Sequence, residues 1–207
     1  MSDFTYEFKT SALKLETYEW DNVWLEQAPV KDAKRVLYIG DSISCATRRV
    51  ATAKSDNTIL FDGFGTSKAV DNPFFMPSVE LFAGQQGGRS AVLFNNGLHG
   101  WHLEDETQYA DEYENVLKSL LKFFDKTPIV LLLTTHVSDK ERDKRVVVRN
   151  KAVSALAEKY GLPTIDLYSV VKADPTLISA DGVHLSKDGY ELLAKTIVNK
   201  VEEIINK

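Results

Sequence analysis

The stretch RVLYIGDSIS, residues 35–44, starts as a continuous apolar run and ends in Gly40, Asp41 and Ser42. A short apolar run rich in β-branched residues is typical of a strand that is buried on both faces of a parallel sheet. Asp and Ser after such a strand are common at the beginning of a helix. Ser42 is therefore either a helix-starting residue or a reactive serine at the mouth of a site. Only its partners elsewhere in the chain can distinguish these interpretations.

Four further runs repeat this pattern, and helix-like segments separate them. The runs are TILF (58–61), AVLF (91–94), IVLLLTT (129–135) and the weaker PTIDL (163–167). The helical segments are 43–54, 74–85, 111–124, 143–160 and a last one that begins near Ser186. Strands and helices that alternate with short connections form right-handed crossovers and a parallel sheet covered on both faces. We expect a three-layer α/β/α sandwich with a five-stranded parallel sheet in flavodoxin-like order.

The length of 207 residues suits one domain, which we place at residues 34–207. Residues 1–33 do not follow the alternation and are rich in aromatic side chains, namely Phe4, Tyr6, Phe8, Tyr18, Trp20 and Trp24. We expect an extension that packs on the domain as an added strand or hairpin. A lid, or a contact between subunits of a homo-oligomer, is the open alternative.

The composition limits the classes of molecule that the protein is expected to bind. A net charge of −5 argues against nucleic acid, because phosphate binding needs a basic surface. No run approaches the 18 apolar residues of a membrane span, and the first residues do not resemble a secretory leader. The single cysteine, Cys45, excludes an internal disulfide. We expect a cytoplasmic protein with a small-molecule partner.

Polar residues follow several of the predicted strands. In open parallel sheets the functional crevice lies outside the carboxyl ends of the strands. Ser42, the segment 95–99 and His136 each follow a strand, and Asp181 and His184 lie in a loop just before the last helix. A serine becomes a nucleophile when a base such as histidine takes its proton, and a carboxylate commonly holds that histidine in the required tautomer. We expect these side chains to meet at one edge of the sheet.

The two end motifs resemble a known family. GDSI (40–43) and DGVH (181–184) look like the first and last blocks of the SGNH, or GDSL, hydrolases, with the resemblance extending over residues 34–207. The resemblance implies that Ser42 is the nucleophile and that its backbone N–H is an oxyanion donor. It further implies that His184 is the base and Asp181 its orienting carboxylate. Asp41 is expected to organise the turn at the substrate site.

The family's second block supplies a glycine whose N–H enters the oxyanion hole. FDGFGTSKA (61–69) offers Gly63 and Gly65 for this role, and we prefer Gly65. Trp101 and His136 are expected to line the substrate pocket, although each could equally have a structural role.

The third block departs from the family pattern. The family usually has Gly-x-Asn-Asp, in which the asparagine side chain donates to the oxyanion, whereas this chain has FNNGLHGWH (94–102). Alignment of the glycines puts His99 in the place of that asparagine, and an imidazole can donate as an amide does. We rank His99 above Asn96 and Asn95 as the donor, and we also expect Asn95 to border the substrate.

These features lead to one preferred function and several alternatives. The resemblance implies a serine esterase or O-deacetylase that needs no cofactor and removes a short acyl group, acetyl above all, from a carbohydrate or another small polar alcohol. A lipid thioesterase, a lysophospholipase or an acyltransferase remains open, as does an inactive binding domain of the same fold. Metal-dependent hydrolysis through His99, His102, His136, His184 and Asp181 is a weaker reading, because no HExxH-type pattern is present.

Overall fold

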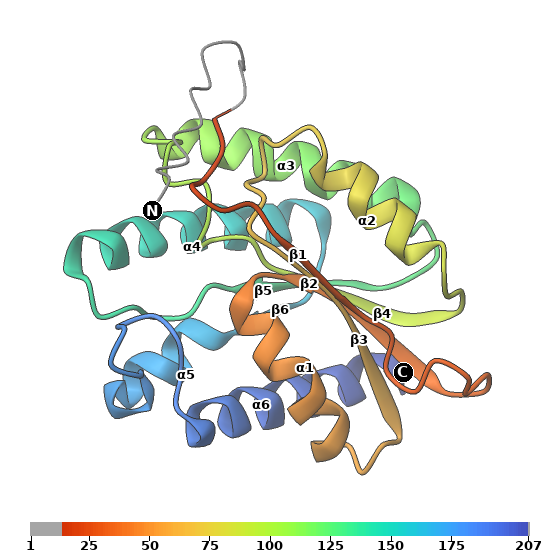
Figure 1. Cartoon of the computed structure of the whole chain (residues 1–207). Coiled ribbons are helices and arrows are strands. Elements are labelled where there is room, and N and C mark those ends of the chain that lie inside the picture. Colours follow the sequence, from red (N-terminus) through yellow and green to blue (C-terminus); the bar gives the residue numbers. More distant parts are fainter. Residues whose placement is uncertain (1–13, 207) are drawn as a thin grey trace, which may run out of the picture.

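The computed structural model describes residues 14–206. In this part of the chain one mixed sheet is present, with the strand order β1-β3-β2-β4-β5-β6 (Figure 1). The strands are β1 (Asp21–Trp24), β2 (Lys34–Gly40), β3 (Ile59–Thr66), β4 (Arg89–Phe94), β5 (Ile129–Leu133) and β6 (Thr164–Asp166). All pairs from β3 to β6 are parallel. The five predicted strands and their flavodoxin-like order are therefore confirmed.

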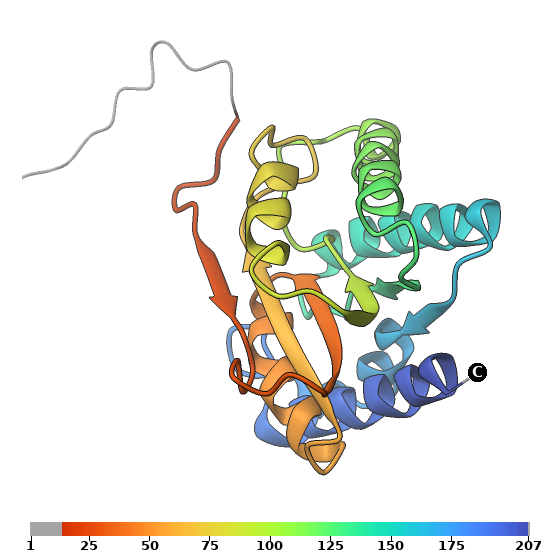
Figure 2. The same cartoon turned by 90° about the vertical axis from the view of Figure 1, so that its right-hand side faces the viewer.

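Helices cover both faces of the sheet, as Figures 1 and 2 show. They are α1 (Ser42–Lys54), α2 (Phe75–Ala83), α3 (Glu106–Phe123), α4 (Lys140–Tyr160), α5 (Leu167–Ala173) and α6 (Lys187–Ile205), with a single 3-10 turn at Pro175–Leu177. One face carries α2, α3 and α4, and the other carries α1, α5 and α6. The predicted helices are present, and Ser186 caps α6 as expected.

The sheet separates two hydrophobic cores. Val36 and Tyr38 of β2 pack into the core beneath α1 and α6, whereas Leu37 and Ile39 pack into the core beneath α2 and α3. Successive side chains of a strand point to opposite faces. A strand with helices on both sides therefore needs apolar residues at every position, which is why the runs in the sequence are continuous.

Part of the N-terminal segment extends the sheet. β1 runs along the outer edge of β3 (Figure 2). The two strands pair antiparallel, with Asn22 opposite Gly65. The connection from β1 to β2 is held by the buried guanidinium of Arg35, which donates to the backbone carbonyls of Glu26 and Gln27 at 2.9 and 3.0 Å. Of the aromatic residues in the predicted extension, Phe4, Tyr6 and Phe8 lie outside the described residues.

Candidate active site

Ser42 is the first residue of α1 and lies directly after β2. The turn before it needs a glycine, because a Cβ on Gly40 would lie 2.8 Å from the Cβ of Ser44. Asp41 is the N-cap, and its Oδ1 accepts from the backbone N–H of Ile43 at 2.9 Å. The half-buried Ser42 thus lies at a helix N-terminus, where free N–H groups and the helix dipole favour negative charge.

Three side chains form a continuous chain of hydrogen bonds at this edge. Nε2 of His184 lies 2.8 Å from Oγ of Ser42, and Nδ1 of His184 lies 2.7 Å from Oδ2 of Asp181. A carboxylate can only accept, so Nδ1 carries a proton and donates it to Asp181. Nε2 of the neutral ring then has a free lone pair that can accept the proton of Ser42. The structure brings together the three residues that the end motifs singled out.

The loop that carries Asp181 and His184 is shaped by local hydrogen bonds. Gly182 has a φ of +77°, a conformation that favours glycine. Oδ1 of Asp181 accepts from the backbone N–H groups of Val183 and His184, both at 2.9 Å. These N–H groups and the ring of His184 hold the pKa of Asp181 well below its usual range. Asp181 is therefore an anion at neutral pH, although its side chain is about half exposed.

The two asparagines after β4 point to different neighbours. Nδ2 of Asn95 donates to the carbonyl of Leu132 and to Oγ1 of Thr134 at 2.8 and 3.0 Å, so this side chain is turned toward β5. Asn96 is fully buried and donates to the carbonyl of Lys68 at 2.8 Å. Its Oδ1 has no hydrogen-bond partner among residues 14–206. Asn96 is thus the asparagine that faces the backbone after β3.

Two residues of the N-terminal segment, Glu16 and Trp20, contact the ring of His99. Its Nδ1 lies 2.9 Å from Oε1 of Glu16, and the ring packs edge-on against Trp20. Burial opposes protonation of His99, but the hydrogen bond to Glu16 and the negative charge of Asp41 outweigh it and raise the pKa of His99. Burial raises the pKa of Asp41, and the positive charges of His99 and His184 oppose this rise. The carboxylate of Asp41 thus lies within the field of both imidazoles.

Comparisons with known proteins identify the fold that carries this site. No family model matches the chain. The isoamyl acetate-hydrolyzing esterase of Schizosaccharomyces pombe is 32% identical over 112 residues, a match that covers 47% of this chain and only 45% of that protein. The crystal structure of a GDSL-like lipase from Bacteroides thetaiotaomicron superposes with a TM-score of 0.67 at 17% identity, over 84% of this chain and 91% of the other. An acetyl esterase solved with an acetate ion gives a TM-score of 0.65 at 13% identity, over 84% and 98% of the two chains.

The chain has the SGNH hydrolase fold. The expected resemblance is confirmed at this level. Within this fold, Ser42 lies directly after strand β2. The loop with Asp181 and His184 lies just before α6, and His184 contacts Ser42.

Gly65 lies near the end of β3, opposite Gly40 of β2 and Asn22 of β1. A Cβ at this position would lie 2.2 Å from Sγ of Cys45 and 3.3 Å from the carbonyl oxygen of Asp41, so the missing side chain makes room for α1 beside the turn that carries Ser42. The role of its N–H as an oxyanion donor stays a prediction. The strand continues past the predicted end at residue 61 because the glycines 63 and 65 lie opposite α1 side chains.

The loop of the third block is fixed by an arginine that sequence reasoning missed. Arg149 of α4 is buried, and its guanidinium donates to the carbonyls of Gly97, His99 and Gly100 at 3.1, 2.7 and 2.9 Å. Its Nε donates to Glu106 at 2.7 Å. Arg149 and Glu16 come from segments 50 and 83 residues away from His99, and neither belongs to a motif. No sequence signal pointed to them.

The other predicted residues lie around the site without joining the Ser42 chain. His136 bonds Asp143 at 2.6 Å, and Asp143 also accepts from Tyr168 at 2.9 Å. Trp101 lies beneath the guanidinium of Arg149 at 4.6 Å from ring to cation. Both residues therefore have structural contacts in addition to any role toward a substrate.

Each of the four histidines pairs with its own carboxylate. The pairs are His99–Glu16, His102–Asp71, His136–Asp143 and His184–Asp181. Within residues 14–206 no group of three or more potential ligand side chains is arranged around a common metal position. In the same part of the chain, no helix is long and apolar enough to cross a membrane.

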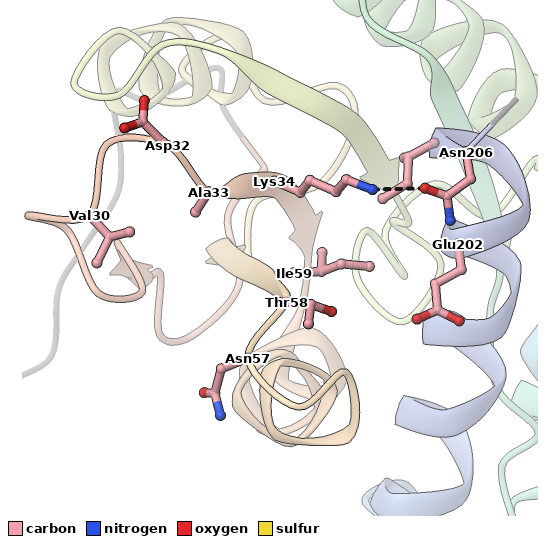
Figure 3. Close-up of a pocket in the computed structure, with 10 residues that line it drawn as sticks. Val30, Asp32, Ala33, Lys34, Asn57, Thr58, Ile59, Glu202 and Asn206 are labelled. Atoms are coloured by element: carbon pink, nitrogen blue, oxygen red, sulfur yellow. Dashed lines mark hydrogen bonds between the residues drawn. The ribbon is translucent and has the colours of Figure 1, made fainter.

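Two cavities help to define where a substrate could enter. A groove of about 510 Å³ runs between the N-terminal segment and the loop after β4, lined by Leu15, Glu16, Thr17, Tyr18, Trp20, Trp101 and His102. Another, of about 480 Å³, lies at the amino ends of β2 and β3, where Lys34 bonds Asn206 at 2.7 Å (Figure 3). None of the candidate site residues lines this second cavity. The groove beside Glu16 includes one candidate site residue, Trp101, whereas Ser42, His184 and Asp181 do not line it.

Proposed function

We propose that this protein is a serine esterase that hydrolyses short acyl esters, acetyl esters above all, of a small polar alcohol. One observation carries the proposal: the hydrogen-bonded chain from Oγ of Ser42 through the imidazole of His184 to the carboxylate of Asp181, with distances of 2.8 and 2.7 Å. This arrangement has the donor, acceptor and tautomer relations that a serine nucleophile needs.

The proposed reaction begins with attack of Ser42 Oγ on the ester carbonyl. Nε2 of His184 takes the hydroxyl proton as the new C–O bond forms, and Asp181 stabilises the resulting imidazolium through Nδ1–H. The carbonyl π electrons move to the oxygen, which becomes an oxyanion. It lies beside the N-terminus of α1, where the backbone N–H of Ser42 can donate to it.

The oxyanion then collapses and the alcohol leaves. His184 returns its proton to the leaving oxygen, so the alcohol departs neutral and an acyl-Ser42 ester remains. A water molecule repeats the sequence, with His184 first taking and then returning a proton. The products are a carboxylic acid and the free enzyme.

His99 is the proposed side-chain donor to the oxyanion, with Asn96 as the alternative. The side chain of Asn95 is already committed to Leu132 and Thr134. Nδ2 of Asn96 is bonded to Lys68. Within the described residues, Nε2 of His99 has no hydrogen-bond partner and is available to a ligand.

The preference for an acetyl group is supported by two similar proteins. The S. pombe relative is named for the hydrolysis of isoamyl acetate, and one of the proteins with a similar fold is an acetyl esterase. The alcohol is proposed to extend into the groove beside Trp101, whose polar and aromatic lining suits a carbohydrate or another hydroxylated compound. A lipid thioester or a transfer to an acceptor other than water is the alternative use of the same chemistry.

A labelling experiment combined with an assay tests the proposal. The purified protein is expected to hydrolyse p-nitrophenyl acetate in the presence of EDTA and to gain one sulfonyl group from phenylmethylsulfonyl fluoride, as measured by intact mass. Ser42→Ala is expected to lose both properties. Equal hydrolysis by the wild type and Ser42→Ala would overturn the proposal. Absence of turnover and labelling with a whole panel of acyl esters would favour a binding domain, which the unusual third block motivates.

A further inference from the structure

We infer that Glu16 is a positioning residue of the active site, which holds His99 as a doubly protonated imidazolium with its Nε2–H directed to the oxyanion. The inference rests on the proposed esterase function. It assigns part of the site to the N-terminal segment, which lies outside both sequence motifs.

The contact between Glu16 and His99 fixes the orientation of the ring. Oε1 of Glu16 lies 2.9 Å from Nδ1 of His99 and 3.4 Å from the backbone nitrogen of Gly100. Trp20 packs edge-on against the same ring with centroids 6.1 Å apart. The backbone of His99 is in turn held by Arg149 through its carbonyl at 2.7 Å. The imidazole is thus held at Nδ1 on the side of the N-terminal segment, and Nε2 lies on the far side of the ring.

The identity of the partner decides what Nε2 can do. A carboxylate accepts hydrogen bonds and cannot donate one, so Nδ1 must carry a proton. A neutral ring would then have a bare Nε2, which accepts hydrogen bonds and repels an oxyanion. Only the imidazolium has a second N–H. His99 can therefore act as an oxyanion donor only while it is cationic.

The charges around His99 favour the cation. Glu16 and Glu19 face it from the N-terminal segment, and the buried Asp41 faces it from the turn that carries Ser42. Arg149 of α4 is the opposing cation, because its guanidinium bonds the His99 carbonyl. Burial opposes the charge on His99, but the three carboxylates outweigh it and its pKa lies above the ordinary value.

The segment that carries Glu16 is anchored firmly enough to position it. The backbone N–H of Trp20 donates to Oγ of Ser67 at 2.8 Å, and the N–H of Ser67 donates to the Trp20 carbonyl at 3.1 Å. Oγ of Ser67 also donates to Glu19 at 2.8 Å. Because Ser67 immediately follows β3, these bonds tie the segment to the sheet directly beside the site.

The arrangement implies a particular pH dependence. The reaction needs His184 neutral and His99 charged. Turnover is therefore lost when rising pH removes the proton from His99, at a pH above the ordinary histidine pKa because the pKa of His99 is raised. Removal of the Glu16 charge is expected to move this loss to lower pH.

The first test is a titration that does not depend on activity. Ring C–H resonances of His99 are followed by NMR against pH in the wild type and in Glu16→Gln, with His99→Asn used to assign them. Gln keeps an oxygen that accepts from Nδ1–H but removes the charge. The expected result is a His99 pKa that falls in Glu16→Gln. An unchanged pKa would overturn the inference.

The second test follows kcat for p-nitrophenyl acetate against pH. The alkaline loss of kcat is expected to move to lower pH in Glu16→Gln and to stay in place in Asp71→Asn, the matched control that removes a carboxylate from His102 in the same loop. In His99→Asn, whose amide donor does not titrate, the alkaline loss is expected to be absent, and the addition of Glu16→Gln is expected to change nothing. An alkaline loss that shifts equally with and without His99 would overturn the inference.

The serine esterase activity and the positioning role of Glu16 can be refuted separately. Full activity in Ser42→Ala would reject the serine esterase itself. Loss of activity in Ser42→Ala, together with a His99 pKa and an alkaline profile that ignore Glu16→Gln, would reject only the role of Glu16. Melting curves of Glu16→Gln and His99→Asn are expected to match the wild type within a few degrees, which separates a site effect from unfolding.

Discussion

Oγ of Ser42 and Nε2 of His184 lie 2.8 Å apart, although 142 residues separate them in the chain. The contact is a consequence of topology. Ser42 begins α1 directly after β2, and His184 lies just before α6, which packs beside α1 on the same face of the sheet. Two helices that begin at the same edge of the sheet bring their first residues together.

Asp181→Asn is expected to lower kcat by roughly 10⁴-fold with little change in KM, because an amide beside Nδ1 no longer selects the required tautomer of His184. Steady-state kinetics with p-nitrophenyl acetate provide the measurement. Ser179→Ala is the control, since it removes the hydroxyl contacts to Asp181 Oδ1 and to the His184 carbonyl but keeps the carboxylate beside Nδ1. A loss of less than tenfold in Asp181→Asn would show that another group orients His184.

His99→Ala is expected to lower kcat by roughly 10² to 10³ while KM changes little, as for other donors that act on the oxyanion. Asn96→Ala is expected to have the smaller effect on kcat. The same assay measures both variants. The opposite ranking would mean that Asn96 is the donor and that the alignment of the third block is displaced.

Arg149→Met is expected to destabilise the protein by about 3–5 kcal/mol, because three loop carbonyls lose their buried donor and Glu106 keeps only Arg145 as a cationic partner among the described residues. Urea unfolding measures the loss. Arg142→Met on the exposed side of the same helix is the matched control and should be near neutral. Equal stabilities of the two variants would contradict the proposed role of Arg149 in holding the loop.

Asp143→Asn is expected to lower the melting temperature at pH 7 by about 3–6 °C, because charged hydrogen bonds to His136 and Tyr168 are lost. Burial would raise the pKa of Asp143, but these bonds outweigh it and lower the pKa. A lowered folded-state pKa stabilises the fold above the ordinary Asp pKa, and this contribution is lost as the pH falls through the lowered value. The difference from the wild type should therefore shrink below about pH 4 in thermal melts. A difference that grows in acid would refute the assignment.

Gly65→Ala is expected to cost about 1–3 kcal/mol, because the new methyl group would overlap Sγ of Cys45. Thermal unfolding measures the change. The second substitution Cys45→Ala removes that sulfur and is expected to restore part of the stability. No restoration in the double variant would mean that the strain arises at the backbone of Asp41, 3.3 Å from the same position.

The sequence was most informative where a local pattern determines the structure. Continuous apolar runs identified the strands that are covered on both faces, and their alternation with helices predicted the order of the parallel strands. The pattern was weakest around residues 163–173, where LYSVV looks like a continuation of the strand but forms α5. Asp166 caps this helix by accepting from the N–H of Ser169 at 2.9 Å, and a single Asp is a weak signal.

The candidate site was predictable to the extent that its residues lie at strand and helix ends. Ser42, Asp181 and His184 belong to short motifs, and each is placed by the loop that contains it. Glu16 and Arg149 contact the loop 97–100, which is far from both in the sequence. Such long-range contacts produce no recognisable pattern in the sequence around either residue. The packing of Gly65 against Cys45 was also not predictable, because the sequence does not show which side chain of α1 faces this position of β3.

The antiparallel strand β1 has a practical consequence for expression of this protein. A truncation that begins at residue 34 would keep every parallel strand, yet the outer hydrogen-bonding groups of β3 would become an open edge. Uncovered edges of this kind template aggregation. The same truncation would also delete Glu16, the carboxylate beside His99. We therefore expect a protein that begins at residue 34 to be both poorly soluble and poorly active.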